Sequence, residues 1–200
     1  MRKIFLDCGA NDGCSVRKFI NENEDYKDYF VHSFEPNPSL HKSFDDIKAI
    51  YKEKFKLHKL GVSNKNSEIT FYRNPNYSSA GTFDNVKGNK KNCGSKVHCD
   101  NVEKLSIKCL DLSSWISENF SKEDYIVLKL DIEGSEYDVV PKMIEDETFS
   151  FINKFYIEWH DKWCGKPNGT SKSYIKKIKN KFSIDSIFWD AQEYQTKKQY

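Results

Sequence analysis

Long apolar runs are missing from this sequence. None of its 200 residues belongs to a stretch that approaches the ~20 apolar residues of a membrane-spanning helix. Residues 1–7 contain two basic side chains, but their apolar stretch is too short for the core of a secretory signal. We therefore expect a cytoplasmic protein with no membrane partner.

A net charge of either sign is missing as well. The 32 basic and 30 acidic residues leave a formal charge of +2. Domains that bind along nucleic acid commonly have many more basic than acidic residues. The near balance of charges therefore predicts no nucleic-acid partner.

The sequence has six cysteines but no Cys-x-x-Cys pair. In a cytoplasmic chain that is long enough to bury a core, reduced thiols are expected rather than disulfides. Cys93, His98 and Cys99 lie close together, yet no second pair of zinc ligands follows them. We predict no zinc site in this segment, and its role stays open.

Apolar strands alternate with amphipathic helices along the chain. Strands are predicted at 3–7, 29–34, 55–62, 68–73, 105–110, 125–130, 151–159 and 184–189, and helices at 15–23, 39–51, 112–120, 134–145 and 171–181. This alternation is typical of a parallel sheet with right-handed crossovers. We predict a single α/β domain over residues 1–200, with a Rossmann-like, doubly wound, mostly parallel sheet and helices on both faces. Residues 74–104 are expected to form a loop or lid.

The turn after the first predicted strand, Cys8-Gly9-Ala10-Asn11-Asp12-Gly13, is the first candidate ligand site. Open α/β sheets bind ligands at the carboxyl ends of their strands. A dinucleotide fingerprint has a glycine where this chain has Asn11, which disfavours a dehydrogenase. Asp7 and Asp12 would repel a pyrophosphate but suit a cationic ligand. S-adenosylmethionine, with its sulfonium and ammonium groups, therefore fits this turn better than NAD.

Glu35 follows the second predicted strand, in the segment Glu35-Pro36-Asn37-Pro38. An acid at this position can accept hydrogen bonds from both hydroxyls of a ribose. Its distance from the glycine turn exceeds the spacing of ~20 residues that is usual, and the polar segment 21–28 would absorb the excess. An ordinary strand-to-helix turn with an exposed Glu35 is the alternative interpretation.

A second group of acids begins at Asp131, directly after the most apolar predicted strand. A carboxylate at such a strand end is costly unless it is partnered or used, which favours a role for Asp131 in a site. Glu133 could face the same site, whereas Glu136 is better explained by the dipole at a helix N-terminus. His160 ends the following strand, and it would converge on Asp131 if the two strands end level; a solvated loop histidine is the alternative.

These side chains suit methyl transfer to a hydroxyl, in which the enzyme positions the acceptor and removes its proton. Either Asp131 or His160 could be the base. Together with Glu133 they could also bind a divalent cation. Two further alternatives remain: a nucleic-acid ribose methyltransferase that uses Lys129 with Asp131, and a module that binds S-adenosylmethionine without turnover.

Three blocks of the sequence, taken in order, resemble the FkbM-type methyltransferase family. They are residues 5–13, 34–38 and 128–136, and residues 157–160 resemble the last motif of that family. The resemblance implies a class I methyltransferase fold and S-adenosylmethionine as the cofactor. It also implies O-methylation of a small-molecule or glycan acceptor, with a sugar hydroxyl as the leading candidate.

The resemblance also implies positions for the cofactor. Asp7, Gly9 and Asn11 would line its methionine part, and Glu35 its ribose. Val62 and Ser63 would lie near the adenine. The full set of expected cofactor-binding residues is Asp7, Gly9, Ala10, Asn11, Gly13, Glu35, Pro36, Val62, Ser63 and Asp131, and the catalytic candidates are Asp131, Glu133 and His160.

Overall fold

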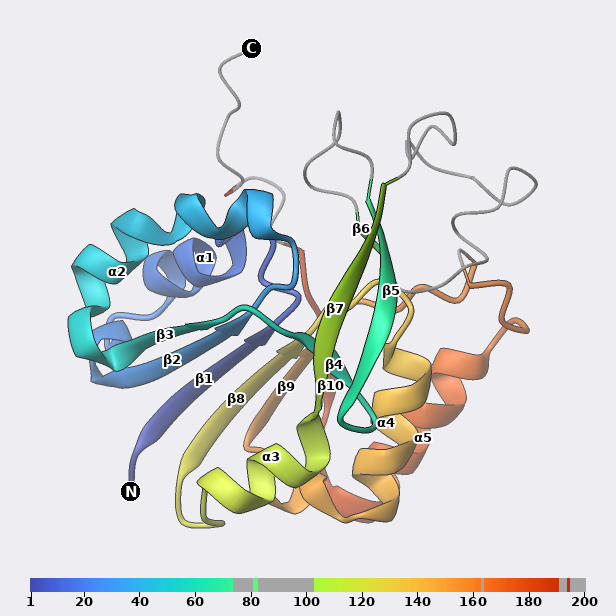
Figure 1. Ribbon diagram of the computed structural model, residues 1–200. Helices are drawn as coiled ribbons and strands as arrows, with labels where there is room; N and C mark the ends of the chain where they lie inside the picture. Colours follow the sequence, from blue (N-terminus) through green and yellow to red (C-terminus); the bar gives the residue numbers. More distant parts are fainter. Residues whose placement is uncertain (74–80, 83–102, 163, 191–193, 195–200) are drawn as a thin grey trace.

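A six-stranded parallel sheet forms the centre of the protein in the computed structural model, which describes residues 1–73, 81–82, 103–162, 164–190 and 194 (Figure 1). Its strands run in the order β10-β9-β8-β1-β2-β3. They are β1 (Lys3–Cys8), β2 (Tyr29–Phe34), β3 (Phe55–His58), β8 (Tyr125–Leu130), β9 (Lys154–Ile157) and β10 (Ser186–Phe188). Every neighbouring pair is parallel. The predicted α/β, Rossmann-like sheet is confirmed.

Helices cover both faces of this sheet, as predicted (Figure 1). The helices are α1 (Cys14–Glu22) and α2 (Asp45–Tyr51) on one face, and α3 (Leu112–Asn119), α4 (Glu136–Glu145) and α5 (Thr170–Phe182) on the other. The chain changes faces between the β1–β2–β3 half and the β8–β9–β10 half. This change makes the fold doubly wound, with its switch point between β1 and β8.

Successive strand residues point into two separate cores. Phe5 of β1 and Val127 of β8 pack with α1 and α2, whereas Ile4, Leu6 and Leu128 pack with α3, α4 and α5. All five side chains are at most 1% exposed. Because both faces of the strands are buried, the strands appear in the sequence as continuous apolar runs.

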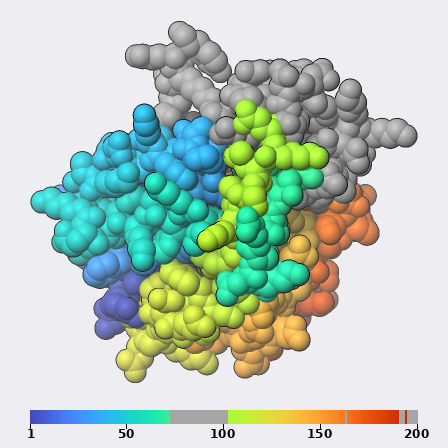
Figure 2. All heavy atoms as spheres, in the orientation of Figure 1, coloured from blue at the N-terminus to red at the C-terminus, as the bar shows by residue number. Residues whose placement is uncertain are grey.

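A second sheet, which the sequence did not predict, stands beside the first. Its strands are β4 (Gly61–Ser63), β5 (Ser67–Arg73), β6 (Gly81–Thr82) and β7 (Glu103–Asp111), in the order β4-β7-β5-β6. β5 and β7 pair antiparallel from Ser67 to Arg73. Figure 2 shows atoms of these two strands forming a wall across this face of the molecule.

The prediction of one strand over 55–62 was wrong. β3 ends at His58, whose carbonyl accepts a hydrogen bond from the Glu35 amide at 3.0 Å, and the chain then leaves the first sheet. From Gly61 it pairs with Cys109 of β7 in the second sheet. Hydrophobicity alone cannot separate two short consecutive strands, because the break depends on pairing with residues that are distant in sequence.

The predicted loop or lid at 74–104 is only partly described. Within it, residues 81–82 form β6, and β7 already begins at residue 103. The remainder, including the cysteine-bearing segment 93–99, lies outside the described residues. The extent of a single domain over residues 1–200 stays a prediction.

Two helix starts differ from the predicted residues 15 and 39. Asn37 accepts a capping hydrogen bond from the Ser39 amide, and a 3-10 helix over Pro38–Phe44 precedes α2. At α1 the Cys14 amide donates to Asp12 Oδ1 at 3.1 Å, and Ser15, where the helix was predicted to begin, is buried. Asn and Asp side chains readily accept from backbone amides two residues ahead.

Other features follow the sequence closely. The helices predicted at 112–120, 134–145 and 171–181 appear as α3, α4 and α5, with ends that shift by one or two residues. Among the described helices none is long and apolar enough to cross a membrane. The four cysteines that the structure describes, Cys8, Cys14, Cys109 and Cys164, are buried and reduced.

A pair of histidines packs between β2, β3 and α3. His32 Nδ1 lies 3.0 Å from His58 Nε2, and the ring of His58 stacks on Phe34 with centroids 4.4 Å apart. Trp115 packs edge-on against both histidines. Burial lowers the pKa of each histidine to about 4, with smaller contributions from nearby positive charge. Both rings are therefore neutral in the folded protein at neutral pH.

Acidification is expected to destabilise the protein through this histidine pair. Between pH 6.5 and about 4 the unfolded chain binds protons at His32 and His58 that the folded protein does not bind. The free energy of unfolding should therefore fall as the pH is lowered through this window, as urea midpoints at several pH values would show. The slope should be shallower in the double variant His32→Phe/His58→Phe, and equal slopes would contradict the assignment.

Candidate active site

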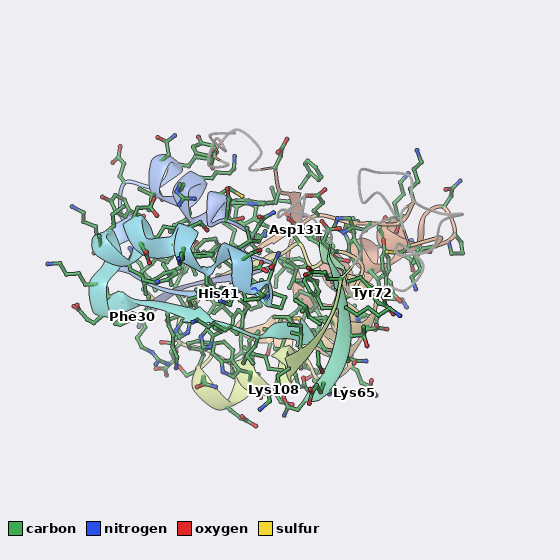
Figure 3. All side chains as sticks on the ribbon, turned by 45° about the horizontal axis from the view of Figure 1, so that its top comes forward. Phe30, His41, Lys65, Tyr72, Lys108 and Asp131 are labelled. Carbon is green, nitrogen blue, oxygen red and sulfur yellow. The ribbon has the colours of Figure 1, made fainter. Side chains whose placement is uncertain are left out.

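The switch point brings the ends of β1 and β8 to the same level. Cys8 pairs with Leu130 in the register of the two strands, so Gly9 and Asp131 leave the sheet side by side. The Asp131 amide donates to the Cys8 carbonyl at 3.1 Å. In Figure 3 Asp131 lies at the centre of this end of the molecule, with Tyr72 of β5 to one side and His41 to the other.

Gly9 makes the close approach of these two chain segments possible. Its φ is 78°, and a Cβ atom at this position would lie 1.7 Å from the Asp131 carbonyl oxygen. On the other side, the amides of Gly9 and Ala10 donate to the Phe34 carbonyl at 3.1 and 3.0 Å. The glycine turn is therefore held between the ends of β2 and β8.

Glu35 is buried and bridges two turns. One carboxylate oxygen accepts from the Asn11 amide at 2.8 Å and the other from the Asn37 amide at 2.7 Å. The side chain is only 6% exposed, so the alternative of an exposed Glu35 is wrong. Burial raises the pKa of Glu35 to about 8, although both backbone donors oppose this shift.

A cavity opens between these turns and the second sheet, with about 550 Å³ of space that is partly open to solvent. Its lining residues are Gly9, Asn11, Phe34, Glu35, Pro36, Asn37, Leu40, Gly61, Val62, Phe71, Asp131, Ile132 and Glu133. None of the described lining residues is basic.

Six of the expected cofactor-binding residues line this cavity, and four do not. The six are Gly9, Asn11, Glu35, Pro36, Val62 and Asp131. Asp7 and Ala10 are fully buried and do not line the cavity, and Gly13 packs against Phe44 and Ile47. Ser63 lines a neighbouring groove instead.

Sequence reasoning missed several lining residues. Phe71 on β5 is the clearest example, because it reaches the cavity only through the position of the second sheet. Leu40 belongs to the 3-10 helix after Pro38. Proximity to the Glu35-Pro36-Asn37-Pro38 motif could have drawn attention to Leu40, whereas no local signal points to Phe71.

Lys129 of β8 contacts residues at the ends of both strands that form the switch point. Its Nζ donates to the Gly9 carbonyl at 2.7 Å and lies 3.4 Å from Asp7 and 3.5 Å from Asp131. Burial lowers the pKa of Lys129, but the two carboxylates raise it by more, so the ammonium stays charged. The side chain is only 1% exposed. It therefore supports the turn from within and is out of reach of a bound acceptor.

Asp131, Glu133 and His160 converge at the rim of the cavity. One ligand atom from each lies within 4.8 Å of the other two, and we call this group the rim cluster. His160 Nε2 is 3.8 Å from Asp131 and 3.7 Å from Glu133. The predicted convergence of Asp131 and His160 is confirmed. His160 is only 4% exposed, so the alternative of a solvated loop histidine is wrong.

Glu136 lies in the first turn of α4, as the predicted interaction with the helix dipole requires, and it also holds the rim cluster in place. It is fully buried, and it accepts from the Ile132 and Gly134 amides at 2.8 Å each. His160 Nδ1 lies 3.1 Å from the same carboxylate. Because a carboxylate accepts hydrogen bonds, Nδ1 donates, and Nε2 is left to face Asp131 and Glu133. In the sequence, Glu136 comes two residues after the turn at Gly134, and this position is the signal that could have indicated its role.

Comparison with known proteins assigns the chain to a family. The sequence model described as the Methyltransferase FkbM domain matches residues 7–190. The chain belongs to the FkbM methyltransferase family. The matched region of this FkbM protein contains the glycine turn, Glu35 and the rim cluster.

One solved relative is the crystal structure of methyltransferase FkbM from Methylobacillus flagellatus KT. It is similar to this FkbM protein at 14% identity and a TM-score of 0.43, over 72% of this chain. The chain covers only 30% of that relative's length. No curated protein matches this chain.

Gly9→Ala is expected to destabilise the protein far more than Gly165→Ala. Both glycines have positive φ, which alone should cost about 1 kcal/mol for alanine. Only at Gly9 would the new Cβ meet backbone, whereas at Gly165 it would meet nothing within 4 Å. Urea unfolding should show an additional loss on the order of 3 kcal/mol for Gly9→Ala. Equal losses for the two variants would contradict the close approach at Asp131.

Proposed function

We propose that this protein transfers a methyl group from S-adenosylmethionine to a hydroxyl oxygen of an acceptor, with a sugar or glycan as the leading acceptor class. Membership of the FkbM methyltransferase family supports methyl transfer. The observation that carries the cofactor assignment is the carboxylate-lined cavity between Gly9 and Glu35 at the switch point. The acceptor class rests on the family resemblance.

The residues around the cavity fit S-adenosylmethionine. Each Glu35 oxygen accepts one backbone hydrogen bond and has capacity for another, which suits the two hydroxyls of a ribose. Phe34, Val62 and Phe71 provide an apolar wall for the adenine. The methionine part would lie against the Gly9 turn. Since the described lining has carboxylates and no basic side chain, it suits a sulfonium and an ammonium but not a pyrophosphate.

The rim cluster lies where the acceptor would meet the methyl group. S-adenosylmethionine supplies an activated methyl group, so the protein has to orient the hydroxyl and promote loss of its proton. Asp131 lines the cavity and also belongs to the rim cluster, which connects the cofactor to the acceptor side. We propose that Asp131, Glu133 and His160 orient the hydroxyl and promote the loss of its proton.

The alternatives have less support. A ribose methyltransferase that uses Lys129 needs this amine at the substrate, but Lys129 is 1% exposed and bonded to the Gly9 carbonyl. A dehydrogenase needs a pyrophosphate site, which the carboxylate lining disfavours. A binding module without turnover would not require Glu136 to orient His160 toward Asp131.

Glu35→Ala should weaken the binding of S-adenosylmethionine at least tenfold, which corresponds to about 1.4 kcal/mol. The loss is expected because the ribose hydroxyls would lose their acceptor. Isothermal titration calorimetry measures it directly. The matched control is Glu22→Ala, which removes an exposed acid on α1 that pairs with Lys18. Unchanged affinity in a folded Glu35→Ala protein would remove Glu35 from the cofactor site.

Asp131→Asn should lower the turnover rate at least about a hundredfold, in line with the loss of a group that assists proton removal. Asparagine keeps the shape of the side chain, so the protein should still fold, and the rate is measured at saturating S-adenosylmethionine to separate turnover from any loss of cofactor affinity. Transfer of a labelled methyl group to a panel of hydroxyl acceptors measures the rate. Asp185→Asn, at an exposed ion pair with Lys179, is the control. A fully active Asp131→Asn protein would exclude a role for this carboxylate.

A further inference from the structure

We propose that the rim cluster is a binding site for a divalent transition-metal ion, held by carboxylate oxygens of Asp131 and Glu133 and by His160 Nε2. Their ligand atoms lie within 4.8 Å of one another at the edge of the cavity. The proposal rests on the proposed function in one respect, because the acceptor hydroxyl would be a further ligand of the ion. The existence of the ion site itself does not depend on the acceptor.

The separations within the rim cluster suit an ion better than direct hydrogen bonds. His160 Nε2 is 3.8 Å from Asp131 Oδ1 and 3.7 Å from Glu133 Oε2, and both distances are too long for a hydrogen bond between these atoms. Two ligands that each lie about 2.1 Å from a shared ion are separated by about 3.0 to 4.2 Å. Both observed distances are within that range.

The imidazole is prepared as a ligand by the residue behind it. Glu136 Oε1 is 3.1 Å from His160 Nδ1 and is fully buried, so it fixes the ring and the proton on Nδ1. The Nε2 lone pair then points toward Asp131 and Glu133. A carboxylate behind a ligating histidine is the usual second partner in metal sites, where it fixes the tautomer and raises the basicity of the ligand.

The charge around the rim cluster is strongly negative. Asp131, Glu133 and Glu158 each place a carboxylate oxygen within 3.9 Å of His160 Nε2. The nearby ammonium of Lys129 contacts Asp131 but is shared with Asp7 and donates to the Gly9 carbonyl. A bound divalent cation would balance this excess at the place where the acceptor arrives.

The ligand set indicates the kind of ion. One imidazole nitrogen with two carboxylates suits manganese, iron, cobalt or zinc, whereas magnesium and calcium prefer oxygen ligands alone. A hydroxyl oxygen bound to such an ion loses its proton to water more readily. The hydroxyl oxygen would then form a bond to the methyl carbon while the carbon–sulfur bond breaks, and the electron pair of that bond would leave with the sulfur as S-adenosylhomocysteine.

Cobalt binding tests the site without cofactor or acceptor. Co²⁺ titrated into the full chain should give visible absorption bands, and Glu133→Gln should weaken its affinity at least tenfold. Glu133 is 41% exposed, so this variant should fold normally. The matched control, Glu145→Gln at the far end of α4, should bind Co²⁺ like the unchanged protein.

Three results would overturn the proposal. They are the absence of Co²⁺ binding at millimolar concentration, equal affinity in Glu133→Gln, and an ultraviolet cobalt–thiolate band that places the ion at cysteines. Calorimetry with S-adenosylmethionine and no added metal ion tests the cofactor site independently of the ion site. A protein that binds the cofactor and transfers methyl groups at full rate in the presence of a chelator would refute the ion and leave the proposed function intact.

Discussion

The contacts of one buried ammonium determine the shape of the switch point. Lys129 Nζ holds the Gly9 carbonyl at 2.7 Å and lies between Asp7 and Asp131. A buried lysine is costly without partners, and so is the buried carboxylate of Asp7, but together with the partly exposed Asp131 these charges compensate one another. The same contacts join β1 to β8 at their carboxyl ends. These contacts hold Gly9 and Asp131 in place. Both residues line the cavity, and Asp131 also belongs to the rim cluster.

The site has two halves that share Asp131. On the cavity side lie Gly9 and Glu35, held by backbone hydrogen bonds between the ends of β1 and β2. On the rim side lies His160, which Glu136 orients from behind. Methyl transfer needs the donor and the acceptor to be aligned, and a residue common to both halves provides that alignment. The buried supports are as important to this arrangement as the residues that line the cavity.

Much of the fold followed from local pattern. The strands of the central sheet, the helices on both faces and the position of the glycine turn were predicted, because each depends on apolar periodicity or on a turn residue nearby in sequence. The convergence of Asp131 and His160 was also predicted, since neighbouring parallel strands end at one edge. The break between β3 and β4 was not, because it depends on the pairing of Gly61 with Cys109.

Local sequence patterns were enough to predict the succession of strands and helices along the chain, the glycine turn and the chemical types of the site residues. The closing of the cavity by Phe71, the burial of Lys129 and the orientation of His160 by Glu136 became visible only in the folded chain. The physical reason is distance along the chain. Periodicity and turn preferences act over a few residues, whereas burial, ion pairing and the second sheet arise from contacts between segments that are far apart in sequence.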